Sequence, residues 1–273
     1  MRSQVLGPDI VVFTSAVWDT TCTAVRSGGQ TLLVDSPVFP EELSAIPALL
    51  GEHGFPVASV RLFNTHADWD HILGPLIFPR APLWCGESTA QRLAENPDEL
   101  AAMKTTFDEM FYVKRPQPLT LDRLEPLPVP GRAQIGALSI ELIRADGHTI
   151  DGTAALFREA RALAAGDYVS PVELPRLRGP LGAHLETLDR LEPVIAGAEV
   201  VIPGHGHPMS REQALGILAE DREYLEQLRD RGPDASLPAG RDDGEQRRIH
   251  VEMNVPSAAG RPVEGIAGGN LPG

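Results

Sequence analysis

Short apolar runs that end in polar residues recur along this chain and predict its strands. Residues 9–18 are rich in β-branched and apolar side chains, which is typical of a strand. Residues 21–26 and 30–34 flank Ser27-Gly28-Gly29, and this pattern predicts a β-hairpin. Residues 57–63 predict a further strand. The second half of the chain carries four more strand-like runs, at residues 138–142, 153–157, 161–165 and 199–202.

Segments with apolar residues at helical spacing separate these strands. Within residues 41–53, Leu43 and Ile46 begin one apolar face. Ser210 with Gln213 three residues later is a capping box, which predicts the start of a last helix. The other predicted helices begin at a capping box formed by Ser88 and Gln91, at Pro97, and at Leu181. In the first half the order is therefore strands, helix and strand, followed by a polar loop.

That polar loop is the densest run of His and Asp in the chain. It holds His66, Asp68, Asp70 and His71 within six residues. Neighbouring carboxylates repel one another, and a divalent cation removes this cost because neutral imidazoles and ionised carboxylates are its usual ligands. In an extended backbone alternate residues share a side, so His66, Asp68 and Asp70 can converge. His71 then points elsewhere and can bind a second ion with Asp70.

Three further segments put a His or an Asp beside a glycine at the end of an apolar run. They contain His148, Asp167 and His205. Glycine lets the backbone turn tightly where a strand ends. Each segment alone is a weak signal, but four such segments in order, each after a predicted strand, predict a metal site.

In the order and type of these residues, the chain resembles the metallo-β-lactamase fold superfamily over roughly residues 9–228. That family carries a His-x-His-x-Asp-His run, then a His, then a bridging Asp, then a last His. The resemblance implies an α/β (α+β) fold, a four-layer αββα sandwich. It also implies two ions, one bound by His66, Asp68 and His148, the other by Asp70, His71 and His205, with Asp167 bridging them.

The chain departs from the family pattern at Asp68, where most members have their second histidine. With a carboxylate at this position, the chain is similar to the flavodiiron branch of the superfamily, which has a Glu there and binds iron. A carboxylate also hardens the site, which shifts its preference from zinc towards iron or manganese. The expected cofactors are two divalent metal ions, zinc by the resemblance, with iron or manganese as alternatives. Direct ligation by Asp68 and a contact through water both remain open.

The resemblance implies hydrolytic chemistry. Three carboxylates, those of Asp68, Asp70 and Asp167, leave one net positive charge on two divalent ions. This charge lowers the pKa of a bound water towards about 7, which gives a hydroxide nucleophile at neutral pH. We assign Asp70 and His207 as candidate catalytic residues, with His207 as a proton donor. The alternative for His207 is a turn histidine held between Gly206 and Pro208.

Asp35 and the helix that begins at Pro97 can each be interpreted in two ways. Asp35 ends the predicted hairpin and either supports the metal loop or only forms a turn. The helix that begins at Pro97 has an apolar stripe, which either packs on the sheet or covers the metal loop as a lid. The stripe consists of Leu100, Met103, Phe107, Met110 and Phe111. The proline-rich residues 116–130 after this helix predict an irregular connection.

Composition narrows the function classes. With 273 residues and 42% apolar side chains, the chain can bury a sizeable core. A net charge of −14 argues against a nucleic-acid partner, because phosphate binding needs a basic surface. The N-terminus lacks the apolar core of a signal peptide, and no stretch approaches the roughly 20 apolar residues of a membrane span. With Cys22 and Cys85 far apart, as expected of reduced thiols, we predict a cytoplasmic protein without a membrane partner.

The composition changes beyond Arg229. Residues 1–229 are expected to form the catalytic domain, and residues 230–273 a glycine- and proline-rich tail or arm. Because few large apolar residues occur there, we expect disorder, or an arm that could join copies of the chain into a homo-oligomer. Residues 247–251 are the one piece expected to dock, as a strand.

The sequence thus predicts a metal-dependent hydrolase that cleaves an ester, thioester, lactone or related bond in a small molecule. A non-haem diiron oxidoreductase is the alternative that Asp68 suggests, although the chain carries no flavodoxin-like domain to supply electrons. A metal-binding protein without turnover is a third reading. It is disfavoured because every ligand position holds a residue that can bind metal.

Overall fold

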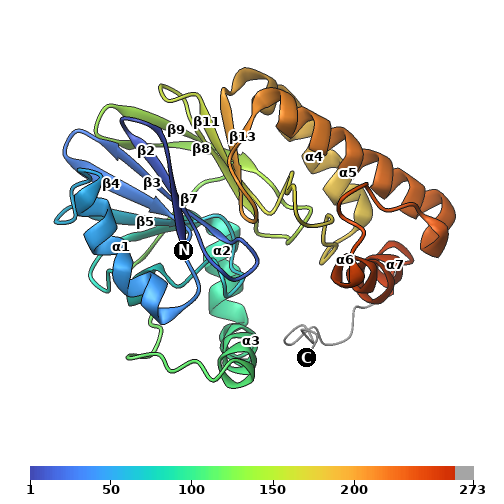
Figure 1. Cartoon of the computed structure of the whole chain (residues 1–273), viewed down its shortest axis with the longest axis horizontal. Helices are drawn as coiled ribbons and strands as arrows, with labels where there is room; N and C mark the ends of the chain where they lie inside the picture. Colours follow the sequence, from blue (N-terminus) through green and yellow to red (C-terminus); the bar gives the residue numbers. More distant parts are fainter. Residues whose placement is uncertain (262–273) are drawn as a thin grey trace.

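The computed structural model describes residues 1–261, apart from the side chain of Glu99, and shows two β-sheets packed face to face (Figure 1). The first sheet runs, in spatial order, β1 (Arg2–Gly7), β2 (Ile10–Thr14), β3 (Thr21–Ser27), β4 (Gln30–Val34), β5 (Val60–Asn64), β6 (Leu83–Gly86) and β7 (Leu124–Leu127). The second runs β13 (Met209–Ser210), β12 (Val200–Pro203), β11 (Ala162–Gly166), β10 (Thr153–Phe157), β9 (Leu138–Arg144) and β8 (Gly131–Ile135).

Helices cover the outer faces of both sheets. The α-helices are α1 (Pro40–Glu52), α2 (Glu87–Glu95), α3 (Pro97–Met110), α4 (Leu181–Gly197), α5 (Arg211–Arg231), α6 (Gly244–Ile249) and α7 (Val255–Ala258). Three shorter turns accompany them: the 3-10 turns Gly74–Leu76 and Gly232–Asp234, and a π-helical turn at His250–Asn254.

The alternation of side chains along each strand creates the four layers. In β2, Ile10 and Val12 face the second sheet and form part of the core between the sheets. Val11 and Phe13 point the other way and pack against Ile46 of α1. On the far side, α4 and α5 pack against the outer face of the second sheet. The predicted αββα sandwich is therefore confirmed.

Most predicted elements are present, and the differences have local causes. The hairpin turns at Gly28 and Gly29, whose positive φ values of 58° and 77° suit glycine. Helix α2 begins at Glu87 and not with a capping box, because the Ser88 hydroxyl donates to the backbone of Asp151. The connection predicted to be irregular contains strand β7, which pairs in parallel with β6.

The segment after α5 differs most from expectation. Residues 247–251 lie in α6 and the following π-helical turn, so the predicted docking strand is wrong. Polar contacts help to hold this segment, beside the apolar contacts of Ala235, Leu237, Val255 and Ala258 with the core of the second sheet. Arg241, only 1% exposed, pairs with Asp221 and donates to the backbone carbonyls of Ser170 and Glu173. A composition argument that counts apolar residues misses this kind of anchor.

The two sheets bring several strand ends to one edge of the sandwich. Strands β4 and β5 are parallel, as are β11 and β12, so their carboxyl ends meet at that edge. The loops after β5, β9, β11 and β12 start there. Within residues 1–261, no helix combines the length and apolar character needed to cross a membrane.

Candidate metal centre

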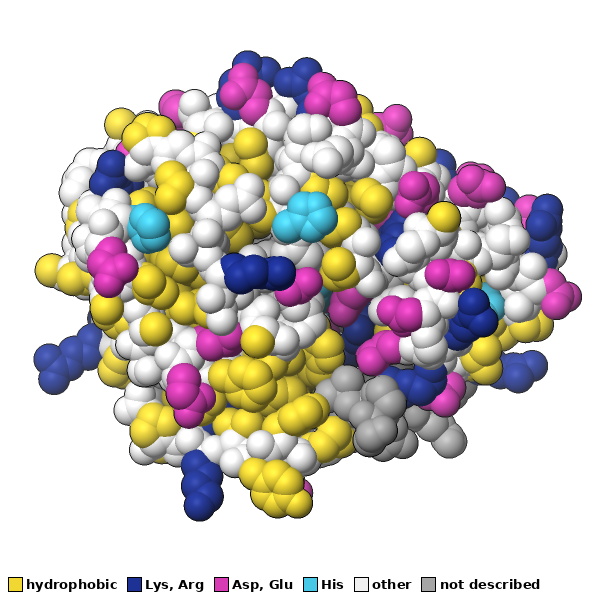
Figure 2. All heavy atoms as spheres, viewed as in Figure 1, with side chains coloured by type: hydrophobic (Ala, Val, Ile, Leu, Met, Phe, Trp, Pro, Cys, Tyr) yellow, Lys and Arg dark blue, Asp and Glu magenta, His cyan; other side chains and the backbone are white. Residues whose placement is uncertain are grey.

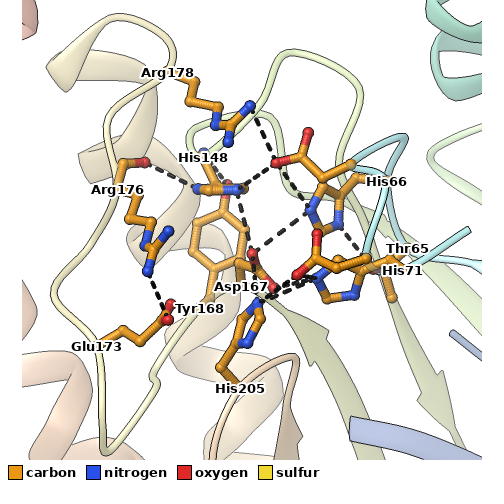
Figure 3. A network of polar contacts seen from close by, with 12 residues as sticks. Thr65, His66, His71, His148, Asp167, Tyr168, Glu173, Arg176, Arg178 and His205 are labelled. Carbon is orange, nitrogen blue, oxygen red and sulfur yellow. Dashed lines mark hydrogen bonds and ion pairs between the residues drawn. The ribbon is translucent and has the colours of Figure 1, made fainter. Parts of the chain in front are cut away.

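Four histidines and three aspartates from these loops gather in one buried cluster (Figure 3). The loop after β5 supplies four of them, and each later strand end supplies one. The members are His66, Asp68, Asp70, His71, His148, Asp167 and His205, which are all the residues predicted to bind metal.

Each of the four imidazoles is held from outside through Nδ1. The Nδ1 atoms lie 3.0 Å from Thr65 Oγ1 for His66, Asp35 Oδ2 for His71, the Arg176 carbonyl for His148 and the Trp18 carbonyl for His205. Carbonyl and carboxylate oxygens only accept, and Thr65 Oγ1 already donates to Asp35, so Nδ1 carries the proton in each ring. Every Nε2 is thereby turned into the cluster as the ligating nitrogen.

Asp167 lies at the centre of the four rings. Its Oδ2 is 3.6 Å from Nε2 of His66, 3.3 Å from that of His148 and 3.4 Å from that of His205. Its Oδ1 is 3.3 Å from Nε2 of His71. One carboxylate that reaches all four imidazoles occupies the position that a bridging ligand requires.

A glycine makes room for that carboxylate. A Cβ on Gly204 would lie 2.1 Å from Oδ1 of Asp167, well inside any real contact. The sequence suggested that the glycines beside the ligands allow tight turns. At Gly204 the requirement is instead the absence of a side chain, because the backbone just after β12 passes directly behind the aspartate.

The donor set fits two metal ions. Two groups of three donors each have all their ligand atoms within 4.8 Å of one another: His66, His148 and Asp167, and Asp70, His71 and His205. Among the described residues, Nε2 of His66, Nε2 of His148 and Oδ1 of Asp167 are buried and have no hydrogen-bond partner. Buried polar atoms without partners are costly, and cations at the centre of the cluster would satisfy them.

Asp68 faces the cluster and two arginines at once. Its Oδ2 lies 3.5 Å from Nε2 of His148 and 3.8 Å from that of His66. Its Oδ1 accepts from Arg92 at 2.9 Å, and Arg178 lies 3.4 Å from Oδ2. Burial alone would raise the pKa of Asp68, but the Arg178 charge, the nearby His148 ring and the charges of His66 and Arg92 hold it well below its usual range. The carboxylate is therefore ionised and its charge is offset from outside the cluster.

The sequence did not identify Asp151, which anchors the outer end of this charge ladder. Its Oδ1 pairs with Arg92 at 2.8 Å, and its Oδ2 accepts from the backbone of Ala67 at 2.8 Å. The side chain is completely buried. Asp151 precedes Gly152 in a stretch with the composition of an ordinary turn, so no local signal marks it. Asp151, Arg92, Asp68 and Arg178 form a row of alternating charges along one side of the cluster.

Asp35 supports the metal loop and forms a turn as well. It accepts from the backbone and the hydroxyl of Thr65, each at 2.8 Å, and it holds His71. Its φ of 55° is unusual for a residue other than glycine. Both readings from the sequence therefore describe this residue.

The two ends of the cluster differ in their proton affinity. Burial would lower the pKa of His205, but the carboxylates of Glu173, Asp167 and Asp70 raise it to about 9. Burial would also lower the pKa of His71, but the charges of Asp167, Asp70 and Asp35 raise it well above its ordinary value. Burial and the neighbouring His71 lower the pKa of His66 well below its ordinary value. Without ions, the His71 and His205 end holds protons at neutral pH.

His207, predicted to be catalytic, lies elsewhere. Its side chain is exposed, and it is absent from the described residues that line the cavity over the cluster. This position matches the alternative reading of a turn histidine. Asp70, the other candidate, lies inside, 3.5 Å from Nε2 of His205.

A cavity of about 70 Å³ opens over the cluster. One wall is apolar and comes from α3 and two tryptophans. The opposite wall comes from the loop after β11 and from the segment that starts with α6. The apolar wall comprises Trp18, Trp69, Met103, Phe107 and Met110, and the opposite wall includes Arg176, Arg178, Glu245, Arg248, Ile249, Glu252 and Met253.

Comparisons with known proteins agree with this architecture. The sequence model of the metallo-beta-lactamase superfamily matches residues 16–205, which include the whole cluster. The search of curated proteins found no match to this sequence.

Solved structures of low sequence identity share the fold. A metallo-beta-lactamase family protein from Thermus thermophilus is 20% identical with a TM-score of 0.66, over 93% of this chain and 91% of that protein. A beta-lactamase domain protein from Burkholderia ambifaria is 18% identical with a TM-score of 0.66, over 94% and 87%. The sec-alkylsulfatase Pisa1 from Pseudomonas sp. is 14% identical with a TM-score of 0.70, over 98% of this chain and 51% of that protein.

Proposed function

Because the chain belongs to the metallo-β-lactamase superfamily, we propose that it is a metal-dependent hydrolase of small-molecule esters, thioesters or lactones. The observation that carries the proposal is the set of four imidazoles, each fixed through Nδ1, whose Nε2 atoms surround Asp167. Such a cage of fixed, buried donors is costly to fold without cations, and its open side faces the cavity beside α3.

The residues divide between two ions. His66, His148 and Asp68 would hold one, while Asp70, His71 and His205 would hold the other, and Asp167 would bridge them. Zinc is the ion we expect, since imidazole nitrogens make up most of the donors. When bound, the ions supply Lewis acidity and lower the pKa of water at the site.

The chain itself supplies orientation and exclusion of water. Asp35 and Thr65 fix the rings of His71 and His66, so the ligating nitrogens need no rearrangement on metal binding. Trp69 and Phe107 pack together above the cluster, with ring centroids 4.7 Å apart, and keep this side of the cavity apolar. Asp70 is the carboxylate of the second group and lines the cavity, which would suit it to accept a proton from water during hydrolysis.

The contacts of Asp68 argue against the diiron alternative. That reading rested on the extra negative charge of a carboxylate at this ligand position. Arg92 and Arg178 both pair with Asp68, so the group presents little net charge to an ion. The site is then electrically similar to one with the family's neutral histidine, and the preference for iron or manganese loses its basis.

The test is metal content together with hydrolysis. Protein purified without added metal should carry about two equivalents of transition metal per chain, and a panel of esters, thioesters, lactones and sulfate esters should identify a substrate. Sulfate esters belong in the panel because one structural neighbour is named as an alkylsulfatase. Removal of metal with a chelator should abolish turnover, and zinc should restore it. Turnover that persists after the metal is removed would refute the proposal.

A further inference from the structure

The cavity over the metal cluster has an unusual supply of methionine. Three of the chain's five methionines, Met103, Met110 and Met253, line it. Methionine is flexible and polarisable, and its side chain adapts to ligands of different length and shape. Two of the three come from α3, and the third comes from the segment after α6, more than a hundred residues away in the sequence.

The two sources form opposite apolar walls. On the α3 side, Met103 and Phe107 are each 4% exposed and pack against Trp69. On the other side, Ile249 and Met253 are 4% and 3% exposed. Figure 2 shows hydrophobic side chains gathered over α3 and charged side chains of both signs over α6. Buried apolar side chains therefore line the cavity from both sides, and Met110, 38% exposed, lies at its outer edge.

The segment that carries Ile249 and Met253 is fixed to the loop that borders the metal site. Gln246 accepts from the backbone of Leu174 at 2.9 Å, and Asn254 accepts from that of Leu177 at 3.0 Å. Asn254 also donates to the carbonyl of Pro175 at 2.7 Å. Arg176, within the same loop, orients His148 through its carbonyl. This wall is thus positioned relative to the metal cluster by hydrogen bonds, and it forms part of the active-site cavity.

We propose that the cavity between α3 and residues 245–253 binds a linear hydrocarbon chain of the substrate. Met103 and Met253 then determine the preferred chain length. The polar end of such a molecule lies at the metal cluster, since Asp70, His148, Asp167 and His205 line the same cavity. The substrate class is therefore an ester or thioester of a medium-length alkyl or acyl chain. This inference rests on the proposed function for the identity of the scissile bond, but not for the binding of the chain.

The first experiment measures binding without catalysis. Linear alcohols of four to ten carbons are titrated into the full-length protein, and the fluorescence of the cavity tryptophans, Trp18 and Trp69, reports binding. Affinity should rise about three- to fourfold with each buried methylene and then level off. Tryptophan at one wall, in Met253→Trp, should make the affinity level off at least two carbons earlier. Met103→Trp tests the opposite wall, and keeps the test decisive if Met253→Trp does not fold.

Val251→Trp is the matched control. Val251 lies on the same segment, but it is 60% exposed and outside the lining of the cavity. This variant should keep the chain-length profile of the wild type. An affinity for alcohols that does not depend on chain length, or an equal change in Val251→Trp and Met253→Trp, would overturn the inference.

The second experiment measures kcat/KM for p-nitrophenyl esters of two to ten carbons. The chain-length profile should follow that of alcohol binding and shift in the same variants. If no ester is hydrolysed but alcohols bind with the expected chain dependence, the proposed function fails and the chain-binding cavity stands. If esters are hydrolysed at rates that do not depend on chain length, the hydrolase stands and the cavity assignment fails.

Discussion

Asp68 and Asp70 lie two residues apart in the same loop, yet they belong to opposite electrostatic regions of the cluster. Asp68 is on the side where Arg92 and Arg178 supply positive charge. Asp70 is on the side of His71 and His205, whose rings are held by a carboxylate and by a backbone carbonyl. In the first region, arginines of the protein offset the negative charge of the carboxylate. In the second region, protons or metal ions must offset the negative charge. A carboxylate at a ligand position can therefore add little net charge to a metal site when neighbouring arginines form ion pairs with it.

The largest effect should come from the residue that joins the two regions. Asp167→Ala removes the carboxylate that reaches all four imidazoles, so both ions should bind far more weakly and activity should fall at least about a hundredfold. His207→Ala, an exposed histidine near the same loop, should stay within about twofold of wild type, as expected for a surface substitution. Metal content and turnover of both variants decide the matter. Equal losses would mean that Asp167 does not bridge.

The next comparison sets the two loop carboxylates against each other in metal-free protein. Asp68→Asn should lower the free energy of unfolding by about 2 to 4 kcal/mol, because it leaves two largely buried arginines without their shared partner. Asp70→Asn removes only one of several carboxylates that face His71 and His205, so the metal-free protein should lose less stability than it does in Asp68→Asn. Urea unfolding after metal removal measures both. A larger loss in Asp70→Asn than in Asp68→Asn would contradict the division into two regions.

These contrasts show how far the sequence alone could go. The four ligand segments were predictable because each is a local pattern at a strand end, and the structure brings all seven side chains together. The surroundings of Asp68 were not predictable, because its partner Arg92 lies 24 positions further along the sequence. Asp151, which pairs with Arg92, lies another 59 positions on. Composition left disorder and an arm as alternatives for the residues after Arg229, since the anchor of the arm, Arg241, is a charged residue that only the fold buries and pairs.

The same division predicts how metal binding depends on pH. Because nearby carboxylates raise the pKa of His205 to about 9 and raise that of His71 too, this end of the cluster holds more protons at neutral pH without metal than the His66 end does. An ion must displace these protons, so its affinity for this end should rise about tenfold per pH unit for each proton released, until pH exceeds the pKa of about 9. The lowered pKa of His66 means that the other end should show a weaker dependence.

Calorimetric titration of zinc into metal-free protein at several pH values, in two buffers of different ionisation enthalpy, counts the protons released. Two binding steps should be visible, and the step with the steeper pH dependence should disappear in His205→Ala. Equal pH dependence of both steps would show that the two ends do not differ in protonation.

The smallest expected effect concerns metal preference, and it tests whether the arginines truly offset Asp68. From the sequence alone, the carboxylate at this position favoured iron or manganese over zinc. The structure changes that expectation, since Arg92 and Arg178 flank the carboxylate and leave little charge for an ion to feel. In the double variant Asp68→His with Arg178→Met, a carboxylate and its nearby cation are replaced together by a neutral ligand and an apolar side chain. The net charge around the site stays the same, and Arg92 keeps Asp151 as its partner. The ratio of zinc to manganese bound after growth in mixed-metal medium should therefore change by less than about threefold, within the variation expected when only the softness of one donor changes. Asp68→His alone leaves Arg178 without a partner, so it should bind both metals more weakly than the double variant does. A large shift towards zinc in the double variant would mean that an ion feels the full charge of Asp68, and that the arginines hold the carboxylate in place without neutralising it.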